Sequence, residues 1–370
     1  MKRFLALFVG LLLITSLSGC IQTKTNTSNS VKIVDTLGRE VEVPANVEKI
    51  VATGPGALRI IVYLNATDRV VGVEDFEKKY PYGRPYAMAH PELRNLPSIG
   101  PGGPGKLPNL EALINLKPDV IFMTYVDTKT ADDIQEKTGI PVVVLSYGTL
   151  ETFEDASLFK SLELAGKILG KEKRANEVIS FIKSIQNDLE KRAENAESPT
   201  AYIGGIGYKG AHGIESTKPA YPAFKVLNVR NVAGSINQSH VFIDKEKLLE
   251  WNPEFIFLDE GGLKLIQEDY SKSPDFYNSL KAFKEGNIYG VLPYNFYSTN
   301  IGTAVADAYF IGKVLYPKRF EDVDPKKKAD EIYNFLVGKP VYEEIAHQFG
   351  GFGRINLENG TVNYSLPISP

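Results

Sequence analysis

A pattern of thirteen residues occurs twice in this chain. The two copies are LEALINLKPDVIF, residues 110–122, and KEKLLEWNPEFIF, residues 245–257. When they are aligned, Glu111 pairs with Glu246 and Pro118 with Pro253. Each copy predicts a short helix, a turn marked by proline and a buried strand. Because the pattern recurs at one offset with no shorter repeat between its copies, it predicts two similar lobes rather than a solenoid.

The rest of the chain alternates strand-like apolar segments with helical ones. In the first half we predict a β-hairpin over 31–44, strands at 50–52, 70–73, 120–123 and 142–145, and helices at 58–64, 110–116 and 131–138. In the second half we predict strands at 201–204, 255–258 and 288–292, and helices at 245–251, 279–284, 302–314 and 325–336. This alternation predicts an α/β fold in which each lobe is a mainly parallel sheet flanked by helices.

A long helical region, residues 153–196, separates the two halves, with a possible break at Gly170. Its apolar residues recur at helical spacing on one face, and the opposite face is charged. The pattern fits an ordinary amphipathic surface helix, and it also fits a rigid strut between two lobes. The position midway between the two copies of the repeated pattern favours the strut, so we predict two lobes joined by one long rigid helix.

The N-terminus, MKRFLALFVGLLLITSLSGC, has a basic start and an apolar stretch too short for a permanent membrane span. Leu17 to Cys20 then form a lipobox-like sequence, which predicts that Cys20 is acylated and anchors the mature chain. A plain signal anchor is the alternative. Cys20 is the sole cysteine, so no intrachain disulfide or cysteine metal cluster can form. A net charge of −3 gives no basic field for nucleic acid.

We therefore predict six segments along the chain. They are a lipoprotein signal peptide (1–20), a flexible tether (21–30), an N-terminal α/β lobe (31–150), a helical region with the connecting helix (151–196), a C-terminal α/β lobe (197–340) and a C-terminal extension (341–370).

Several segments together resemble one family. They are VKIVDTLGREVEVPANVEKIV (31–51), RVVGVE (69–74), TGIPVVVL (138–145) and the two copies of the repeated pattern. In this order they are similar to the substrate-binding lipoproteins of ABC importers, in the class that carries ferric siderophores, haem and cobalamin. The resemblance covers about residues 31–315. It implies two lobes with a ligand cleft between them, and a protein that performs no chemistry and has no intrinsic cofactor.

The resemblance also implies partners and a location. The protein would sit on the outer face of the cell membrane and deliver its ligand to a permease dimer, which a cytoplasmic ATPase drives. Glu111 and Glu246 would each meet arginines on one permease half. A second explanation is local: Asn109 and Asp244 are good N-caps, which places each glutamate where the helix dipole favours a carboxylate.

Candidate ligand contacts follow from the rule that ligands bind beyond the carboxyl ends of parallel strands. Two such loops stand out, GGIGYKGAHG (204–213) and PYNFYST (293–299), because glycines permit close approach and aromatic rings give broad contact. Lys209, Lys106 and Arg59 would meet an anionic chelate. The candidate residues are Arg59, Glu74, Tyr125, Tyr208, Lys209, His212, Tyr294, Phe296 and Tyr297.

The leading ligand is a ferric siderophore-type complex, with corrinoid, haem or another metal complex as alternatives. A phenolate such as that of Tyr208 can ligate iron. A bare metal ion is a further alternative, which would need a set of histidines facing the cleft, and the four histidines of the chain show no ligand spacing that favours it.

Two signals of other chemistry are weak. The segment GPGGPGK (100–106) begins like a phosphate-binding loop, but Leu107 follows where Ser or Thr is required, so a rigid loop at the cleft edge fits better. An extracytoplasmic enzyme on the same scaffold is the alternative of another class, with carboxylates that have no fixed partner. Those carboxylates are Glu74, Asp75, Asp259 and Glu260.

The lipobox interpretation has a direct test. Because acylation needs the thiol, Cys20→Ser should move the protein from the membrane to the soluble fraction without changing its fold. Fractionation with salt and carbonate washes, beside circular dichroism, measures both. A Cys20→Ser protein that still partitions wholly with membranes would contradict the assignment.

Overall fold

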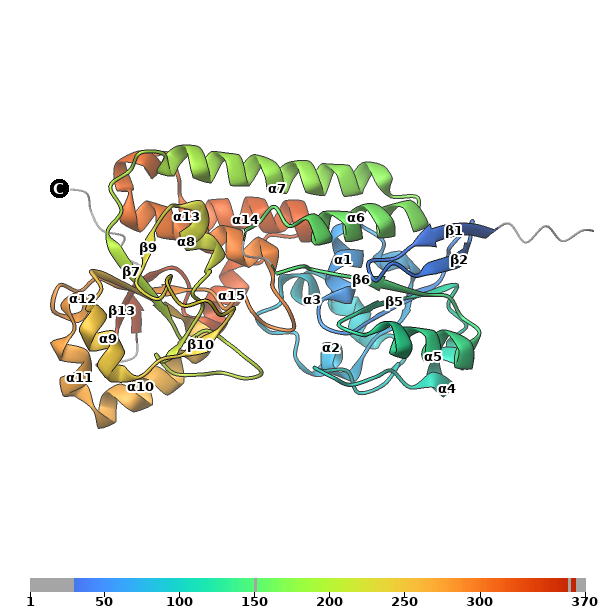
Figure 1. The fold of residues 1–370 in the computed structure, drawn as a ribbon, viewed down its shortest axis with the longest axis horizontal. Helices are drawn as coiled ribbons and strands as arrows, with labels where there is room; N and C mark the ends of the chain where they lie inside the picture. Colours follow the sequence, from blue (N-terminus) through green and yellow to red (C-terminus); the bar gives the residue numbers. More distant parts are fainter. Residues whose placement is uncertain (1–29, 150–151, 359–360, 364–370) are drawn as a thin grey trace, which may run out of the picture.

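The computed structural model describes residues 30–149, 152–358 and 361–363. Two lobes lie side by side, and one long helix, α7, runs across both (Figure 1). The predicted signal peptide and nearly all of the predicted tether lie outside the described residues. Within the described part of the chain, no helix has both the length and the apolar character needed to cross a bilayer.

The first lobe is built on a parallel sheet of four strands in the order β4-β3-β5-β6. Every residue of β3, β5 and β6 is buried, as in sheets that helices cover on both faces. A hairpin, β1 (Ser30–Val34) with β2 (Glu40–Pro44), precedes the sheet. The other elements are β3 (Ile50–Thr53), α1 (Ala57–Tyr63), β4 (Val70–Gly72), α2 (Asp75–Lys79), α3 (Pro85–Ala89), α4 (Leu110–Leu116), β5 (Val120–Thr124), α5 (Thr128–Thr138) and β6 (Val142–Leu145).

The second lobe has a six-stranded sheet in the order β14-β13-β12-β11-β7-β9. β12, β11, β7 and β9 are parallel, whereas β13 and β14 are antiparallel. Its strands are β7 (Thr200–Gly204), β9 (Arg230–Asn231), β11 (Phe255–Asp259), β12 (Ile288–Val291), β13 (Gly353–Asn356) and β14 (Thr361–Asn363), with β8 (Ser216–Thr217) and β10 (Val241–Phe242) as a separate pair. Its helices are α8 (Pro222–Val226), α9 (Lys245–Trp251), α10 (Leu263–Lys272), α11 (Pro274–Ser279), α12 (Lys281–Lys284), α13 (Ile301–Leu315), α14 (Pro325–Val337) and α15 (Tyr342–Phe349).

The C-terminal segment belongs to the second lobe. β13 pairs with β12, and the ring of Phe352 stacks on Phe310 of the buried helix α13 at 4.7 Å. The backbone N–H of Phe352 donates to the hydroxyl of Tyr342 at 2.9 Å. The division at residue 340 that the sequence suggested therefore does not mark a structural boundary.

The repeated pattern folds into the same local structure in both lobes. α4 and α9 have the bounds that the sequence predicts, and each ends at a residue in the left-handed region, Lys117 with φ 48° and Asn252 with φ 41°. Leu113 and Leu248 are buried at equivalent positions and anchor each helix to its lobe.

The acidic residue before each strand of the pattern also has the same role. The backbone N–H of Asp119 donates to the carbonyl of Lys49, and its carboxylate accepts from the N–H of Lys49 at 2.8 Å. Glu254 makes the same pair of bonds with Thr200, the carboxylate bond being 2.9 Å. Each copy thus aligns the central strand of its lobe with the neighbouring strand, β3 or β7.

The connection between the lobes consists of more than one helix. The predicted break at Gly170, where φ is 60°, separates α6 (Ala156–Ile168) from α7 (Glu172–Ala193). The Nε of Arg174 on α7 donates to the carbonyl of Tyr63 in the first lobe, and its guanidinium also bonds the carbonyl of Phe335 on α14. α14 in turn contacts α1 and α3, and one apolar core runs through both lobes. The strut is therefore part of a helical layer shared by the two sheets.

Candidate functional site

The loop of residues 293–300 follows β12 and reaches from the second lobe to the first, so we call it the crossing loop. Arg59 on α1 is fully buried, and its guanidinium donates to the carbonyl oxygens of Thr299 at 2.6 Å and of Tyr297 at 3.0 Å. Two weaker bonds, at 3.3 Å, go to the carbonyls of Phe296 and Ser298. Arg59, predicted from the sequence to meet an anionic ligand, instead holds the two lobes together.

A second contact between the lobes joins Glu74 and Tyr297. The hydroxyl of Tyr297 donates to Glu74 Oε2 at 2.7 Å and accepts from the backbone N–H of Gly103 at 3.0 Å. Glu74 Oε1 accepts from the hydroxyl of Thr53 at 2.7 Å and from the N–H of Gly54 at 3.0 Å. Burial raises the pKa of Glu74, and the bond from Tyr297 partly opposes that rise. Glu74 and Tyr297, which the sequence suggested as ligand contacts, therefore bind each other in this structure.

The GPGGPGK segment supports this contact. The N–H that meets Tyr297 belongs to its Gly103, and a Cβ added at Gly102 would lie 2.6 Å from the Cβ of Glu74. Gly102 also has a φ of 65°, which other residues rarely adopt. The glycines therefore allow the backbone to pack closely against Glu74 and Tyr297 where the two lobes meet. The segment has a structural role and is not a phosphate-binding loop.

Arg84 is a buried residue of this region that the sequence did not single out. Its guanidinium pairs with Glu77 at 2.5 Å, and the hydroxyl of Tyr86 donates to the same carboxylate at 2.8 Å. It also lies over the rings of Phe296 and Tyr297, 5.5 and 5.8 Å from their centroids. Phe296 is half-buried against the first lobe as a result.

Tyr125 is the exposed aromatic residue that the first lobe brings to the crossing loop. It follows β5 with a φ of 55° and is 65% exposed. Its hydroxyl lies 2.9 Å from the hydroxyl of Ser298. Tyr80, also exposed, lies near the same loop through its contact with Phe76, whose ring is 4.4 Å from that of Tyr297.

Tyr208 is the corresponding exposed residue of the second lobe, at 43% exposure. The carbonyl of its neighbour Gly207 accepts from the side chain of Asn295, which places this loop beside the crossing loop. The Tyr208 ring stacks on His240 at 4.3 Å, and Lys209 Nζ is 5.5 Å from the Tyr208 ring centroid. Lys209 is exposed and His212 is half-buried.

His240, which the sequence did not suggest as a contact, completes this group. Its Nε2 lies 2.8 Å from the hydroxyl of Ser216, and its ring meets that of Phe242 edge-on at 4.8 Å. Burial lowers its pKa, and the neighbouring His212 lowers it further. β10, which leads from His240, has only two residues, so no strand pattern marked this position in the sequence.

The remaining aromatic candidate lies in the core. Tyr294 is 1% exposed and packs on Tyr221 with ring centroids 5.5 Å apart. The sequence correctly placed it in a loop beyond a strand end, but its side chain turns inward. It cannot meet a ligand in the described arrangement.

Of the carboxylates considered for catalysis, Asp259 and Glu260 are also buried. Burial raises the pKa of Asp259 to about 8 and that of Glu260 well above its ordinary value. Each accepts a backbone N–H, from Gly261 at 2.9 Å and from Gly351 at 2.8 Å. Within the described residues, no three side chains of His, Cys, Asp or Glu are grouped so as to hold a metal ion.

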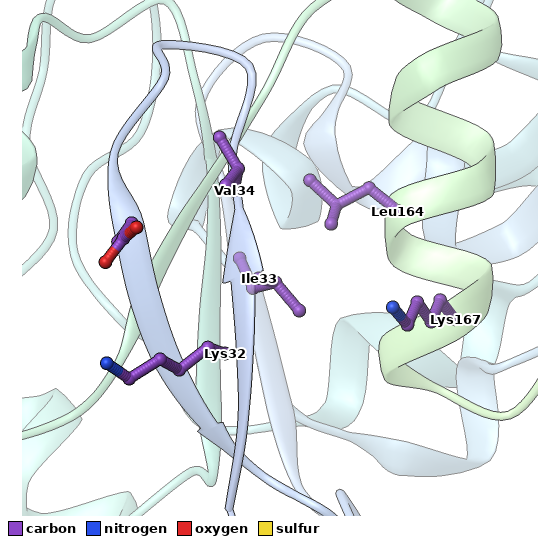
Figure 2. Close-up of a pocket in the computed structure, with 6 residues that line it drawn as sticks. Lys32, Ile33, Val34, Leu164 and Lys167 are labelled. Atoms are coloured by element: carbon purple, nitrogen blue, oxygen red, sulfur yellow. The ribbon is translucent and has the colours of Figure 1, made fainter.

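Two of the cavities in the described part of the chain are not lined by the loop of residues 293–300. One of about 260 Å³ lies between the N-terminal hairpin and α6 and is lined by residues including Lys32, Ile33, Leu164 and Lys167 (Figure 2). Another of about 590 Å³ lies in the second lobe between α8 and the segment that leads toward β10. Neither contains Tyr125 or Tyr208.

The fold and the position of these loops correspond to a known class of protein. This chain belongs to the periplasmic binding protein family, whose profile matches residues 50–294. It is a substrate-binding protein of an ABC transporter and acts outside the cytoplasm, as a receptor rather than an enzyme. A permease and an ATPase are the partners that this class implies.

Two relatives match most of the chain. The molybdate-binding protein MolA of Haemophilus influenzae is 27% identical over an alignment of 333 positions that covers 81% of this chain and 89% of that protein. The uncharacterized substrate-binding lipoprotein YvrC of Bacillus subtilis is 22% identical over 267 residues, 71% of this chain and 78% of YvrC. The structure of MolA bound to molybdate superposes with a TM-score of 0.66 at 24% identity, covering 84% of this chain and 98% of that one.

The structure of a solute-binding protein from Veillonella parvula superposes with a TM-score of 0.67 at 19% identity, covering 87% and 97% of the two chains. These superpositions establish the shared fold.

The Tyr297–Glu74 contact can be tested by removing one oxygen. Tyr297→Phe leaves Glu74 Oε2 buried without its donor, so the free energy of unfolding should fall by about 1–3 kcal/mol. Tyr125→Phe also removes a hydroxyl between the lobes, but an exposed one, and should change it by less than about 0.5 kcal/mol. Urea unfolding of the two variants measures both. Equal effects would contradict the structural role assigned to Tyr297.

Proposed function

We propose that this chain is the lipid-anchored receptor of an ABC importer and that it captures an anionic metal chelate, of the ferric siderophore type, beside the crossing loop. The supporting observation is the pair of exposed tyrosines, Tyr125 and Tyr208, that approach this loop from opposite lobes. Lys209 adds a positive charge beside the Tyr208 ring. Broad aromatic surface with a peripheral cation suits a large anionic complex.

The state of the arginines supports a chelate over a small oxyanion. An oxyanion such as molybdate needs several preorganised N–H and O–H donors directed at one point. Arg59 and Arg84 are both buried, and their terminal nitrogens already bond carbonyl and carboxylate groups of the protein. Exposed side chains of this region that carry donors include Tyr125 in the first lobe and Tyr208 and Lys209 in the second.

A receptor for molybdate is the second candidate, because the alignment with the molybdate-binding protein MolA covers 81% of this chain. It would require the crossing loop to release part of the guanidinium of Arg59. Direct ligation of iron by the Tyr208 phenolate is a finer form of the first proposal, since Tyr208 is 43% exposed.

A ligand panel separates these candidates. Isothermal calorimetry of the protein with a ferric catecholate, a ferric hydroxamate, molybdate and sulfate should show binding of a ferric complex and none of sulfate. Tyr208→Ala should weaken that binding about tenfold, a loss of 1.4 kcal/mol, because aromatic contact is lost. Leu265→Ala, an exposed apolar residue on α10, is the matched control. Binding of molybdate alone would favour the second candidate.

We further propose that Glu111 and Glu246 dock the receptor on the permease. Both side chains are exposed at the second position of their helices, and neither has an ion-pair partner within the described part of the chain. The helix dipole alone stabilises a carboxylate here by about 0.3–1 kcal/mol. Asn109 caps α4 through its side chain, with the N–H of Ala112 as donor at 3.1 Å, and Asp244 makes no such bond.

The docking proposal and the dipole explanation predict different results for one double variant. Glu111→Gln with Glu246→Gln should reduce affinity for the permease complex in nanodiscs more than tenfold, because arginines there would lose their counter-charges. Thermal unfolding and ligand affinity should stay unchanged. Glu136→Gln with Glu268→Gln, one exposed glutamate per lobe, is the control. Unaltered permease affinity in the first variant would leave only the dipole effect.

A further inference from the structure

Two histidines of the second lobe contact Tyr208, the exposed aromatic residue of the candidate ligand site. The ring of His240 stacks on the Tyr208 ring, with centroids 4.3 Å apart and an angle of 10° between the planes. The Nε2 of His212 lies 2.7 Å from the backbone carbonyl of Tyr208. The ring of Phe242 meets both imidazoles edge-on, at 4.8 Å in each case. One aromatic contact residue therefore has an imidazole on its ring and another on its backbone.

The hydrogen bonds of the two imidazoles define which ring nitrogen carries the proton. A carbonyl oxygen can only accept, so the Nε2 of His212 is the donor in its bond to Tyr208. Ser216 has a single hydroxyl proton, which it donates to the carbonyl of Ile206 at 2.6 Å. The Nε2 of His240, 2.8 Å from the same hydroxyl oxygen, must therefore donate to it. In each neutral imidazole the lone pair is then on Nδ1.

Both Nδ1 atoms can accept a proton without the loss of any contact. Neither has a hydrogen-bond partner within the described part of the chain, and solvent reaches both. A proton added at Nδ1 leaves the Nε2 bonds intact, since an imidazolium donates from both of its nitrogens. His212 and His240 can therefore gain charge while the contacts that hold Tyr208 stay as they are.

Two lysines lie near the histidines and oppose that charge. Lys209 Nζ is 5.5 Å from the centroid of the Tyr208 ring, and Lys218 directly follows β8. Burial lowers the pKa of His240, and the neighbouring His212 and Lys218 lower it further. This part of the lobe therefore disfavours an additional positive charge unless an anion is close to it.

The protein itself supplies no such anion among the described residues, because no carboxylate there forms an ion pair with either imidazole. Glu215 is the acidic residue of the same loop, and its carboxylate accepts the backbone N–H of Gly213 at 3.1 Å. Burial raises the pKa of the core residues Tyr202 and Tyr277, and the charge of Glu215 raises both further. The Glu215 carboxylate therefore acts toward the core of the lobe.

We infer that His212 and His240 are charge-regulated recognition residues, which take up protons from the solvent at Nδ1 when an anionic ligand binds beside Tyr208. The inference rests on the proposed function, because it takes an anionic chelate as the ligand. The bound anion supplies the counter-charge that the protein lacks, so the charged form of the imidazoles is more favourable in the complex. Because binding then takes up protons, the affinity increases as the pH falls.

The arrangement favours anionic complexes over neutral complexes of similar size. A ferric ion bound by three catecholate dianions is an anion, whereas one bound by three hydroxamate monoanions is neutral. Both complexes can contact the ring of Tyr208, but only the anion stabilises an added charge on the imidazoles. The preference for the catecholate complex should therefore grow as the pH falls.

Isothermal calorimetry with a hexadentate ferric tris-catecholate tests this role. Between about pH 8 and about pH 6 the affinity of the parent protein should rise about tenfold, and the heat measured in different buffers should show proton uptake. His212→Gln with His240→Gln should bind as the parent does at the higher pH and about tenfold more weakly at the lower one. A glutamine amide can keep each Nε2 bond but takes up no proton.

Three controls accompany the double variant. Protonation of the catecholate complex itself affects both proteins equally, so the ratio of their affinities reports the histidines. A neutral ferric tris-hydroxamate should bind the parent equally well at both pH values. His90→Gln should follow the parent, because His90 is at the end of α3 and bonds the carbonyl of Val337 at 3.0 Å. Each single glutamine variant should lose part of the pH dependence.

The outcomes separate this inference from the proposed function. If the parent and the double variant bind the catecholate complex with the same pH profile, the charge-regulated role is overturned and the chelate receptor stands. A loss of affinity in the double variant that is equal at both pH values would also overturn it, since the histidines would then only position Tyr208. If neither ferric complex binds the parent at any pH, the proposed function is overturned, and this inference with it.

Discussion

A buried guanidinium organises the space between the two lobes. Among the described residues, Arg59 has neutral hydrogen-bond partners alone, namely the carbonyl oxygens of four consecutive residues and the hydroxyl of Tyr147. An unpaired cation in that position would be costly, so the loop must direct its carbonyl dipoles at one point. Consecutive left-handed residues, Tyr297 and Ser298, give the loop the required turn. The same turn brings the Tyr297 hydroxyl to Glu74 and the Ser298 hydroxyl to Tyr125, so the surface beside the candidate ligand site depends on this one cation.

The sequence predicted the regular elements well, because their apolar periodicity is a local property. The bounds of α4 and α9 agree with the prediction to the residue, and the break at Gly170 lies between two helices. The prediction from the sequence failed for segments whose structure depends on contacts with residues far away in the chain. β13 has few residues and is stabilised as a strand by β12, more than sixty positions earlier in the chain. Nothing in a local pattern could have shown that the C-terminal segment completes the second sheet.

The candidate site was predicted at the level of loops and less well at the level of side chains. The strand-end rule selected the loops that carry Tyr125, Tyr208 and Tyr297, and all three lie beside or within the crossing loop. The rule does not tell which side chains turn inward. Tyr208 is exposed, whereas Tyr297, in an equally aromatic and polar stretch, is taken up by a carboxylate more than two hundred residues away. Only the tertiary fold distinguishes the two.

The position of β13 has a consequence for how the second lobe is made. The hydrogen-bonding groups of β12 that β13 covers would otherwise form an open sheet edge, a template for pairing with other chains. β12 precedes β13 by about sixty residues in the chain, so a lobe without β13 would leave this edge of the sheet open. α13 and α14 of the helical layer precede α15 in the chain. The segment that follows α15 therefore protects the second sheet from pairing with other chains at this edge.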